Sequence, residues 1–327
     1  MTRILLTGGA GYIGSHSAKR VAQAGFEPVT IDDLSTGHKW AVKWGPFIEG
    51  DIGDQKLICD VVAEYQIQAV LHFAAYTNVG ESISNPRKYF RNNVAATLRM
   101  LDTLIDSSVR HVIFSSSCAT YGNPEHVPLS ESHSQKPVNP YGESKLMIER
   151  ILHWYGNAYG FKTASLRYFN AAGADPDGEL GEMHSPETHL IPLVMQAAAG
   201  AIDSVSVFGT DYPTPDGTAI RDYTHVCDLA DAHVLALKYL LNGGASVQLN
   251  LGTGRGHSVL DVIHAVEEVS GRCVPVQHSA RRAGDPPELV ADAAKAREVL
   301  NWRARFDDLR EIVRTAWTWH SQNAEPS

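Results

Sequence analysis

The stretch Thr7-Gly8-Gly9-Ala10-Gly11-Tyr12-Ile13-Gly14 lies between a short apolar segment, residues 3–6, and a helical pattern that runs to Gly25. A strand, a glycine-rich turn and a helix in this order are typical of a dinucleotide-binding site, because the glycines let the backbone approach a pyrophosphate at the helix N-terminus. The spacing here is G-x-x-G-x-x-G, whereas most dehydrogenases have G-x-G-x-x-G. The context therefore predicts a bound dinucleotide rather than a turn without a ligand.

The acid at the end of the next expected strand, residues 27–32, indicates which dinucleotide binds. A carboxylate at this place accepts hydrogen bonds from the adenosine ribose and repels a 2′-phosphate, so it favours NAD over NADP. Asp33 is the neighbouring candidate, but the position at the strand end favours Asp32.

The alternation of apolar and helical segments predicts the fold class. Further strands are expected at residues 47–52, 69–75, 111–117 and 163–170, with helices at residues 55–65 and 85–107 between them. Strands separated by helices of this length indicate parallel βαβ units, so we expect an α/β fold with a doubly wound parallel Rossmann sheet. Ligands bind at the carboxyl ends of such strands, where Ala74, Ala75 and Ser117 would lie beside the glycine turn.

A change of pattern near residues 170–180 predicts a second domain. A loop is expected at residues 171–187, and it is followed by a helix at 191–199, a strand at 206–208 and a turn-rich stretch at 211–217. The expected division is an NAD-binding Rossmann domain at residues 1–178 and a smaller C-terminal α/β substrate domain at residues 179–327. The segment from about 218 to 245 is expected to pack back onto the first domain.

Tyr141 and Lys145 are four residues apart in a stretch that is expected to be helical from Pro140 onward. At this spacing the two side chains share one face of a helix, and proline suits the first helical position. A nearby ammonium favours the phenolate, so Lys145 is expected to lower the pKa of Tyr141 and to make it a base near neutral pH. Such a pair also arises by chance, and its expected place at the ligand-binding edge of the sheet is what indicates a site.

The composition excludes several classes of function. A net charge of −9 and a pI near 5.9 argue against a nucleic-acid or membrane partner, and no apolar run approaches the roughly 18 residues of a membrane span. The start of the chain does not resemble a signal peptide. No H-E-x-x-H or Cys/His ligand spacing occurs, so no metal is expected. Four scattered cysteines are expected to be free buried thiols in a reducing cytoplasm: Cys59, Cys118, Cys227 and Cys273.

Three motifs carry a family likeness: T-G-x-x-G-x-x-G at residues 7–14, the serine run that ends at Ser117, and Y-x-x-x-K at residues 141–145. Together they resemble the extended short-chain dehydrogenase/reductase superfamily and its NAD-dependent epimerase/dehydratase family. Further stretches are similar to UDP-glucose 4-epimerases: F-A-A-x-x-x-V-G-E-S (73–82), N-N-V (92–94), P-Y-G-x-S-K-L (140–146), L-R-Y-F-N (166–170), G-T-D-Y-P-T-x-D-G-T-x-x-R-D-Y-x-H-V-x-D-L (209–229) and R-R-x-G-D (281–285). The likeness extends over essentially the whole chain.

The resemblance implies a set of ligand-binding residues. NAD would be held by Gly8, Gly11, Tyr12, Ile13, Gly14, Asp32, Asp51, Ile52, Phe73, Ala74, Ala75, Asn92, Lys145 and Phe169. A UDP-sugar would be held by Ser117, Tyr141, Asn170, His189, Leu190, Val207, Phe208, Arg221, Arg282 and Asp285. Read without the resemblance, the isolated arginines are either surface residues or a pair that converges on a pyrophosphate.

Two positions depart from the pattern of the family. Thr77 stands where the enterobacterial epimerase has a lysine that reaches the cofactor. Leu289 stands where other members have tyrosine or cysteine, at a position that gates the 2-substituent of the sugar.

The reaction that the resemblance implies is reversible epimerisation at carbon 4 of UDP-glucose or UDP-galactose, through a 4-keto intermediate and with tightly bound NAD. Tyr141 would be the base, Lys145 would lower its pKa and bind the nicotinamide ribose, and Ser117 would relay the proton. A homodimer through the helices expected at residues 85–107 and 145–159 is also implied.

Several alternatives stay open: a UDP-N-acetylhexosamine or UDP-xylose/arabinose 4-epimerase, a net dehydrogenase, and a non-catalytic NAD-binding regulator. A 4,6-dehydratase is disfavoured, because Cys118-Ala119-Thr120 occupies the place of its Asp-Glu pair. A serine hydrolase is disfavoured because the chain has no G-x-S-x-G motif.

Overall fold

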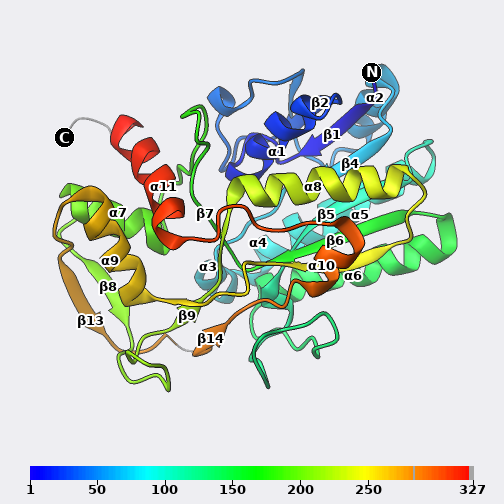
Figure 1. The fold of residues 1–327 in the computed structure, drawn as a ribbon. Helices are drawn as coiled ribbons and strands as arrows, with labels where there is room; N and C mark the ends of the chain where they lie inside the picture. Colours follow the sequence, from blue (N-terminus) through cyan, green and yellow to red (C-terminus); the bar gives the residue numbers. More distant parts are fainter. Residues whose placement is uncertain (283, 324–327) are drawn as a thin grey trace.

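Seven parallel strands form the central sheet, in the order β11-β6-β5-β4-β1-β2-β3. The structure is a computed structural model that describes residues 1–282 and 284–323 (Figure 1). The strands of this sheet are β1 (Arg3–Thr7), β2 (Glu27–Asp32), β3 (Phe47–Glu49), β4 (Ala69–His72), β5 (His111–Ser117), β6 (Lys162–Tyr168) and β11 (Val247–Leu251). This topology confirms the expected doubly wound α/β fold.

Helices cover both faces of this sheet, as the alternation of side chains along each strand requires. Ile4 and Leu6 of β1 pack on one face against α1 (Tyr12–Gln23), α8 (Val226–Leu241) and α10 (Ala294–Leu300). Leu5 between them packs on the opposite face, where α2 (Gln55–Tyr65), α5 (Thr97–Ile105) and α6 (Pro140–Tyr159) cover the sheet. The two resulting cores fix the strand ends from which the binding site is built.

Three expected strands end earlier in the structure than in the sequence pattern: besides β3 and β4, the strand expected at residues 163–170 ends at Tyr168, and Asn170 begins β7 (Asn170–Ala172) in another sheet. β3 ends at Glu49 because its partner β2 ends opposite, at Asp32, so the expected extension to residue 52 has nothing to pair with. β4 ends at His72, opposite Thr7, because β1 gives way to the glycine turn there. Beyond β3 and β4 the chain forms loop at the ligand-binding edge.

The helix expected at residues 85–107 is present as three consecutive segments. α4 (Pro86–Tyr89) is followed by a π-helical segment, η2 (Phe90–Ala96), and then by α5. Shorter elements nearby are η1 (Lys39–Ala41), α3 (Val79–Ser84) and η3 (Cys118–Thr120). A π-helical segment often marks a functional site, and Asn92 of this one lines the cavity described below.

The second half of the chain forms a smaller unit around its own core. Its helices are α7 (Leu190–Ala199), α9 (Val259–Ser270) and α11 (Leu309–Asn323), which bury side chains such as Val194, Val266 and Val313 together. Three small sheets join it: β7 (Asn170–Ala172) with β10 (Tyr223–His225), β8 (Val205–Phe208) with β13 (Val276–Ser279), and β9 (Ile220–Arg221) with β12 (His257–Ser258) and β14 (Glu288–Leu289). Figure 1 shows this unit beside the end of the large sheet, whereas α8 returns to lie along α1.

The cysteine prediction is half correct. All four thiols are free, and Cys118 and Cys227 are buried, but Cys59 and Cys273 are exposed. Cys59 is exposed because the buried side of α2 consists of Ile58, Val61 and Val62, and Cys273 follows the end of α9. Within the described residues, no helix combines the length and the apolar character that a membrane span requires.

Candidate active site

A cavity of about 1160 Å³ lies at the carboxyl ends of the large-sheet strands and extends to the smaller unit. All fourteen residues expected to hold the cofactor line it: Gly8, Gly11, Tyr12, Ile13, Gly14, Asp32, Asp51, Ile52, Phe73, Ala74, Ala75, Asn92, Lys145 and Phe169. Residues that are scattered over the first 169 positions therefore meet around one space.

The glycine turn forms the floor of one end of the cavity. Gly8 has a φ of +72°, and a Cβ on it would lie 2.5 Å from the backbone nitrogen of Ala74. A Cβ on Gly14 would lie 2.2 Å from the carbonyl oxygen of Gly8. No side chain fits at either place, so the glycines are required for the turn and leave the N-terminus of α1 open to a ligand.

Asp32 lies at the end of β2 with its carboxylate held by the backbone. Its Oδ2 accepts a hydrogen bond from the backbone N–H of Ala10 at 2.9 Å, and its Oδ1 accepts one from that of Leu34 at 2.9 Å. Burial raises the pKa of Asp32, and these two hydrogen bonds oppose the rise. Asp33 also lines the cavity, but it is exposed and its carboxylate accepts from the backbone of Ser35 instead. The fixed orientation favours Asp32 as the ribose-binding acid.

Ser117, Tyr141 and Lys145 line the middle of the same cavity. α6 begins at Pro140, and the side chain of its N-cap residue, Asn139, accepts a hydrogen bond from the backbone of Gly142 at 2.8 Å. Lys145 donates from Nζ to the carbonyl oxygen of Ser115 at 2.8 Å, and its Nζ lies 5.9 Å from the centre of the Tyr141 ring. The structure thus brings the three expected catalytic side chains together.

The expected direction of the Tyr141 pKa is wrong for the protein chain alone. Burial raises the pKa of Tyr141 to about 12, while its hydrogen bond with Ser117 lowers it by less. Burial also lowers the pKa of Lys145 to about 7, although Glu149 opposes this. Desolvation disfavours the charged form of both groups, and a lysine near its own pKa supplies less positive charge to its neighbour.

A buried ion pair under Lys145 was not expected from the sequence. Glu149, one turn further along α6, accepts hydrogen bonds from Arg167 Nε at 2.8 Å and from the Ser116 hydroxyl at 2.5 Å. The side chains of Arg167 and Glu149 are each 5% exposed. The spacing of four residues between Lys145 and Glu149 was the available signal, because it places the acid on the buried face of the same helix.

The residues expected to hold the sugar nucleotide line the same cavity, from its middle to its other end, with one exception. These are Ser117, Tyr141, Asn170, His189, Leu190, Phe208, Arg221, Arg282 and Asp285. Val207 does not line it, because alternate residues of β8 face opposite ways and the Val207 side chain lies in the core of the smaller unit. Thr77 and Leu289, the two departures from the family pattern, also line the cavity.

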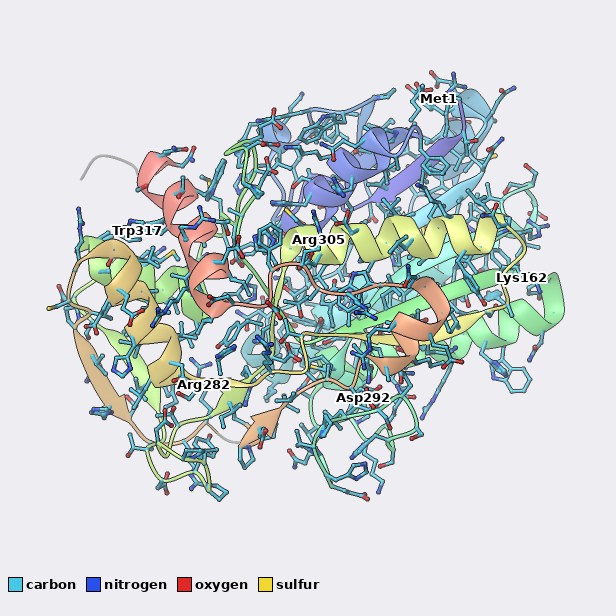
Figure 2. All side chains as sticks on the ribbon, in the orientation of Figure 1. Met1, Lys162, Arg282, Asp292, Arg305 and Trp317 are labelled. Carbon is cyan, nitrogen blue, oxygen red and sulfur yellow. The ribbon has the colours of Figure 1, made fainter. Side chains whose placement is uncertain are left out.

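Two arginines face this end of the cavity in different ways. Arg221 forms an ion pair with Asp285. The guanidinium of Arg282 lies 3.9 Å from the centre of the Phe208 ring, and Figure 2 labels this residue in the smaller unit. The neighbouring Arg281 instead pairs with Asp211 at 2.7 Å and does not line the cavity. The wall also includes Glu182, His184 and Glu187, which the sequence pattern did not single out.

Comparison with known proteins shows relatives that cover nearly the whole chain. A sequence profile described as the NAD dependent epimerase/dehydratase family matches residues 4–252. A UDP-glucose 4-epimerase of Streptococcus mutans is 50% identical over 321 residues, which cover 97% of this chain and 96% of that protein.

Two solved structures resemble the fold over nearly the whole chain. The UDP-glucose 4-epimerase of Brucella ovis in complex with NAD has a TM-score of 0.95 and 53% identity, with 98% of each chain covered. The UDP-glucose 4-epimerase of Bifidobacterium longum in complex with NAD⁺ and UDP has a TM-score of 0.94 and 36% identity, with 98% of this chain and 99% of that chain covered.

Proposed function

The chain belongs to the NAD-dependent epimerase/dehydratase family, and we propose that it interconverts UDP-glucose and UDP-galactose by inverting carbon 4 of the hexose, with NAD as its bound cofactor. The observation that supports this most directly is the single cavity, which contains the glycine turn, the Ser117–Tyr141–Lys145 set and the arginines of the smaller unit. An enzyme that only bound NAD would not need the arginines.

NAD fits the cofactor end of the cavity because the glycine turn there carries no side chains that would obstruct the ligand. The pyrophosphate would lie against the glycine turn at Gly8 and Gly14, where a Cβ has no room. The adenosine ribose would be held by Asp32, and the nicotinamide end would lie near Lys145. Bound NAD supplies a reversible hydride acceptor for carbon 4 of the sugar, which passes through a 4-keto form.

Tyr141 takes the proton of the 4-hydroxyl group and later returns it, while Ser117 donates a hydrogen bond to the same oxygen. A phenol whose pKa is about 12 is a poor base, so the cofactor-bound state must lower that pKa. A positive nicotinamide ring beside the phenol and a charged Lys145 would both do so, since each favours the phenolate. The pKa of Lys145, about 7, is near enough to neutrality for a bound ligand to shift its charge.

The sugar nucleotide would be tethered by its UDP part while the sugar turns over. Arg221 and Arg282 supply the positive charge for the diphosphate, and Asn170 offers an amide in the wall of the same cavity. We keep the division into an NAD-binding part, residues 1–178 with the segment from about 218 to 245, and a UDP-sugar-binding part, residues 179–327, except that β11 at residues 247–251 also belongs to the large sheet.

The same proposal includes a homodimer in the cytoplasm. α6 exposes large apolar side chains, with Trp154 70% and Tyr159 48% accessible, which suits a helix that pairs with a second copy of the chain. The free thiols suit a reducing compartment.

The test is to incubate the purified protein separately with UDP-galactose, UDP-GalNAc and UDP-xylose and to identify the products by mass and chromatography. We expect UDP-glucose from UDP-galactose and no net formation of NADH. Absence of any turnover, or NADH that accumulates with turnover, would contradict the proposal. Faster conversion of UDP-GalNAc would instead favour the second candidate, an N-acetylhexosamine 4-epimerase, which the unusual Leu289 in the cavity wall would then explain.

A further inference from the structure

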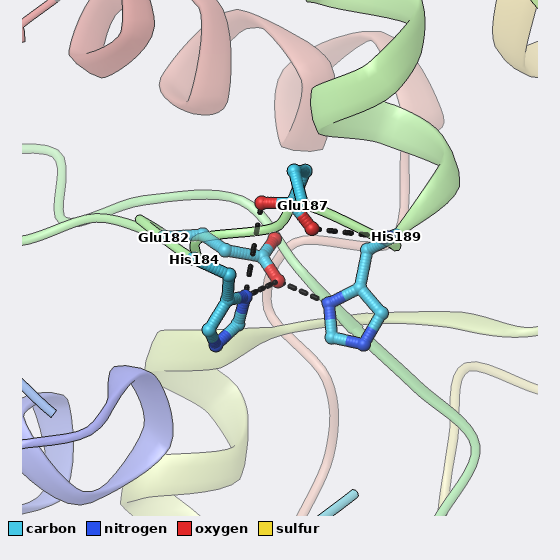
Figure 3. Close-up of side chains that lie close together, drawn as sticks. All are labelled: Glu182, His184, Glu187 and His189. Carbon is cyan, nitrogen blue, oxygen red and sulfur yellow. Dashed lines mark hydrogen bonds and ion pairs between the residues drawn. The ribbon is translucent and has the colours of Figure 1, made fainter. Parts of the chain in front are cut away.

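Four side chains from a single short segment converge in the wall of the cavity just before α7 (Figure 3). Glu182, His184, Glu187 and His189 each offer one metal-ligand atom, and these four atoms all lie within 4.8 Å of one another. Figure 3 shows both histidine rings directed at the same carboxylate, which belongs to Glu182. The spacing in the sequence is E-x-H-x-x-E-x-H, which differs from the zinc motifs named above.

The distances are close to those of a four-coordinate cation site. His184 Nδ1 lies 3.3 Å from Glu182 Oε1 and 3.7 Å from Glu187 Oε2, and His189 Nδ1 contacts the same oxygen of Glu182. A tetrahedral zinc ion with bonds of about 2.0–2.1 Å holds its ligand atoms about 3.3–3.5 Å apart. The ligand atoms would therefore move by an ångström or so to surround the ion.

The backbone orients one of the two carboxylates, that of Glu187, for this role. Glu187 Oε1 accepts hydrogen bonds from the backbone N–H groups of Thr188 at 2.7 Å and His189 at 2.9 Å, which leaves Oε2 directed at the cluster. The side chains of Glu182 and Glu187 are 8% and 5% exposed, whereas that of His189 is 47% exposed. An ion can therefore reach the cluster from the cavity past His189 and meet a Glu187 carboxylate that is already oriented.

A second acidic group in the described part of the chain shows the contrast. Asp175, Asp177 and Glu179 also lie close together, but Lys19 Nζ is 2.7 Å from a carboxylate oxygen of each. That group already holds a positive charge from α1. Among the described residues, no lysine or arginine forms an ion pair with the four side chains of the cluster at residues 182–189. Their ion pairs are those between the glutamates and the histidines of the cluster itself.

We propose that Glu182, His184, Glu187 and His189 bind one divalent cation, and that Zn²⁺ is preferred. Two imidazole nitrogens and two carboxylate oxygens suit zinc, whereas magnesium and calcium favour sites made of oxygen alone. Four protein ligands leave no open position, so the ion is structural: it fixes residues 182–189, which lead into the cavity wall at His189 and Leu190. The ion takes no part in the chemistry at carbon 4. His189 would bind it through Nδ1, which leaves Nε2 for the contact with the UDP-sugar that the resemblance implies.

The test uses the full chain with its cofactor, stripped of metal with a chelator, and titrated with Zn²⁺ alone in a calorimeter. We expect one Zn²⁺ per chain and a thermal midpoint that rises with Zn²⁺ concentration. His184→Ala should weaken Zn²⁺ binding by at least about tenfold. His153→Ala, which removes an exposed histidine from α6, is the matched control and should leave Zn²⁺ binding unchanged.

A second pair of variants keeps the test decisive if His184→Ala does not fold. Glu187→Gln should also weaken Zn²⁺ binding, while Asp177→Asn, in the group that holds Lys19, should not. Wild-type protein that shows no saturable Zn²⁺ binding would overturn the proposal. So would equal Zn²⁺ affinity in the wild type and in Glu187→Gln, or a loss of affinity in Asp177→Asn of the same size. Tighter binding of Mg²⁺ than of Zn²⁺ would overturn the preference for zinc.

Discussion

The two ends of the cavity are built in different ways. At the cofactor end, backbone at the ends of parallel strands makes the contact surface, as Gly8 and Gly14 show. At the sugar-nucleotide end, single side chains on short strands and loops do so, as Arg221 and Arg282 show. A change at the first end therefore disturbs the fold and the ligand together, whereas a change at the second end removes one contact. Four substitutions test this difference.

Tyr141→Phe tests the point where the two ends meet, and we expect the largest effect there. Loss of the base should lower kcat by about 10²–10⁴-fold, while UDP-sugar binding is kept, because only the proton acceptor is removed. Steady-state kinetics and a binding titration with UDP measure the two quantities. Activity within about tenfold of the wild type, about 1.4 kcal/mol, would show that Tyr141 is not the base. Ser117→Ala should be milder.

Gly14→Ala tests whether the cofactor end depends on backbone. A Cβ would lie 2.2 Å from the carbonyl oxygen of Gly8, so the turn must shift and bound NAD should be lost during purification. The absorbance of NAD released on denaturation measures this. Gly11→Ala is the comparison, since its Cβ would meet the same oxygen at 3.4 Å, an ordinary contact. Gly11→Ala should fold normally. Equal unfolding midpoints for Gly11→Ala and Gly14→Ala would contradict the expectation that only the Cβ at Gly14 disturbs the turn.

Arg221→Gln tests the sugar-nucleotide end. We expect KM for the UDP-sugar to rise about 10–100-fold, with a smaller change in kcat and an unchanged content of NAD, because one charge-assisted contact is lost. Arg281→Gln is the matched control. That guanidinium pairs with Asp211 and is 41% exposed, so its loss should change KM by less than about threefold. A larger effect at Arg281 than at Arg221 would reverse the assignment.

His233→Gln tests how acid acts on the cofactor end, and the expected effect is the smallest. The His233 ring packs 4.7 Å from that of Phe73, and burial lowers its pKa to about 4 against 6.5 in an unfolded chain, while a hydrogen bond to Leu229 opposes the shift. Between these values the unfolded state binds more protons, so the free energy of unfolding falls as the pH drops from 6.5 toward 4.

The variant should therefore show a flatter dependence on pH, by at most about 1.4 kcal/mol per pH unit. Urea unfolding at pH 7 and at pH 5 measures the difference. An equal change in the free energy of unfolding between the two pH values, in wild type and variant, would contradict this prediction.

The same contrast explains what could be predicted from the sequence. The expected strand at residues 111–117 and helix at 55–65 have those bounds in the structure, because apolar periodicity reports directly on burial. The expected strand at 47–52 is too long, because its end depends on where a partner strand stops. The direction in which the pKa of Tyr141 shifts could not be predicted from the sequence, because it depends on desolvation, which the spacing of residues does not reveal.

At the sugar-nucleotide end, too, some features could not be predicted from the sequence. Val207 was expected there with Phe208, yet the two side chains face opposite ways. The strand was expected at residues 206–208, but the resemblance implied both residues as ligands and the alternation of the strand was not applied. The cluster at Glu182, His184, Glu187 and His189 was not anticipated, because its spacing lies in an expected loop, where no periodicity brings side chains together.

The edge strand β11 has a consequence for how this chain can be built and rearranged. It pairs with β6 along Ala164–Tyr168, yet it is encoded after much of the smaller unit. On the ribosome, the edge of β6 stays without its neighbour until the chain has been made as far as Leu251. A fragment that stops at residue 178 would expose that edge and should aggregate. A chimera that exchanges the smaller unit between related proteins would have to take its pieces from either side of α8 and β11, and keep those two elements with the large sheet.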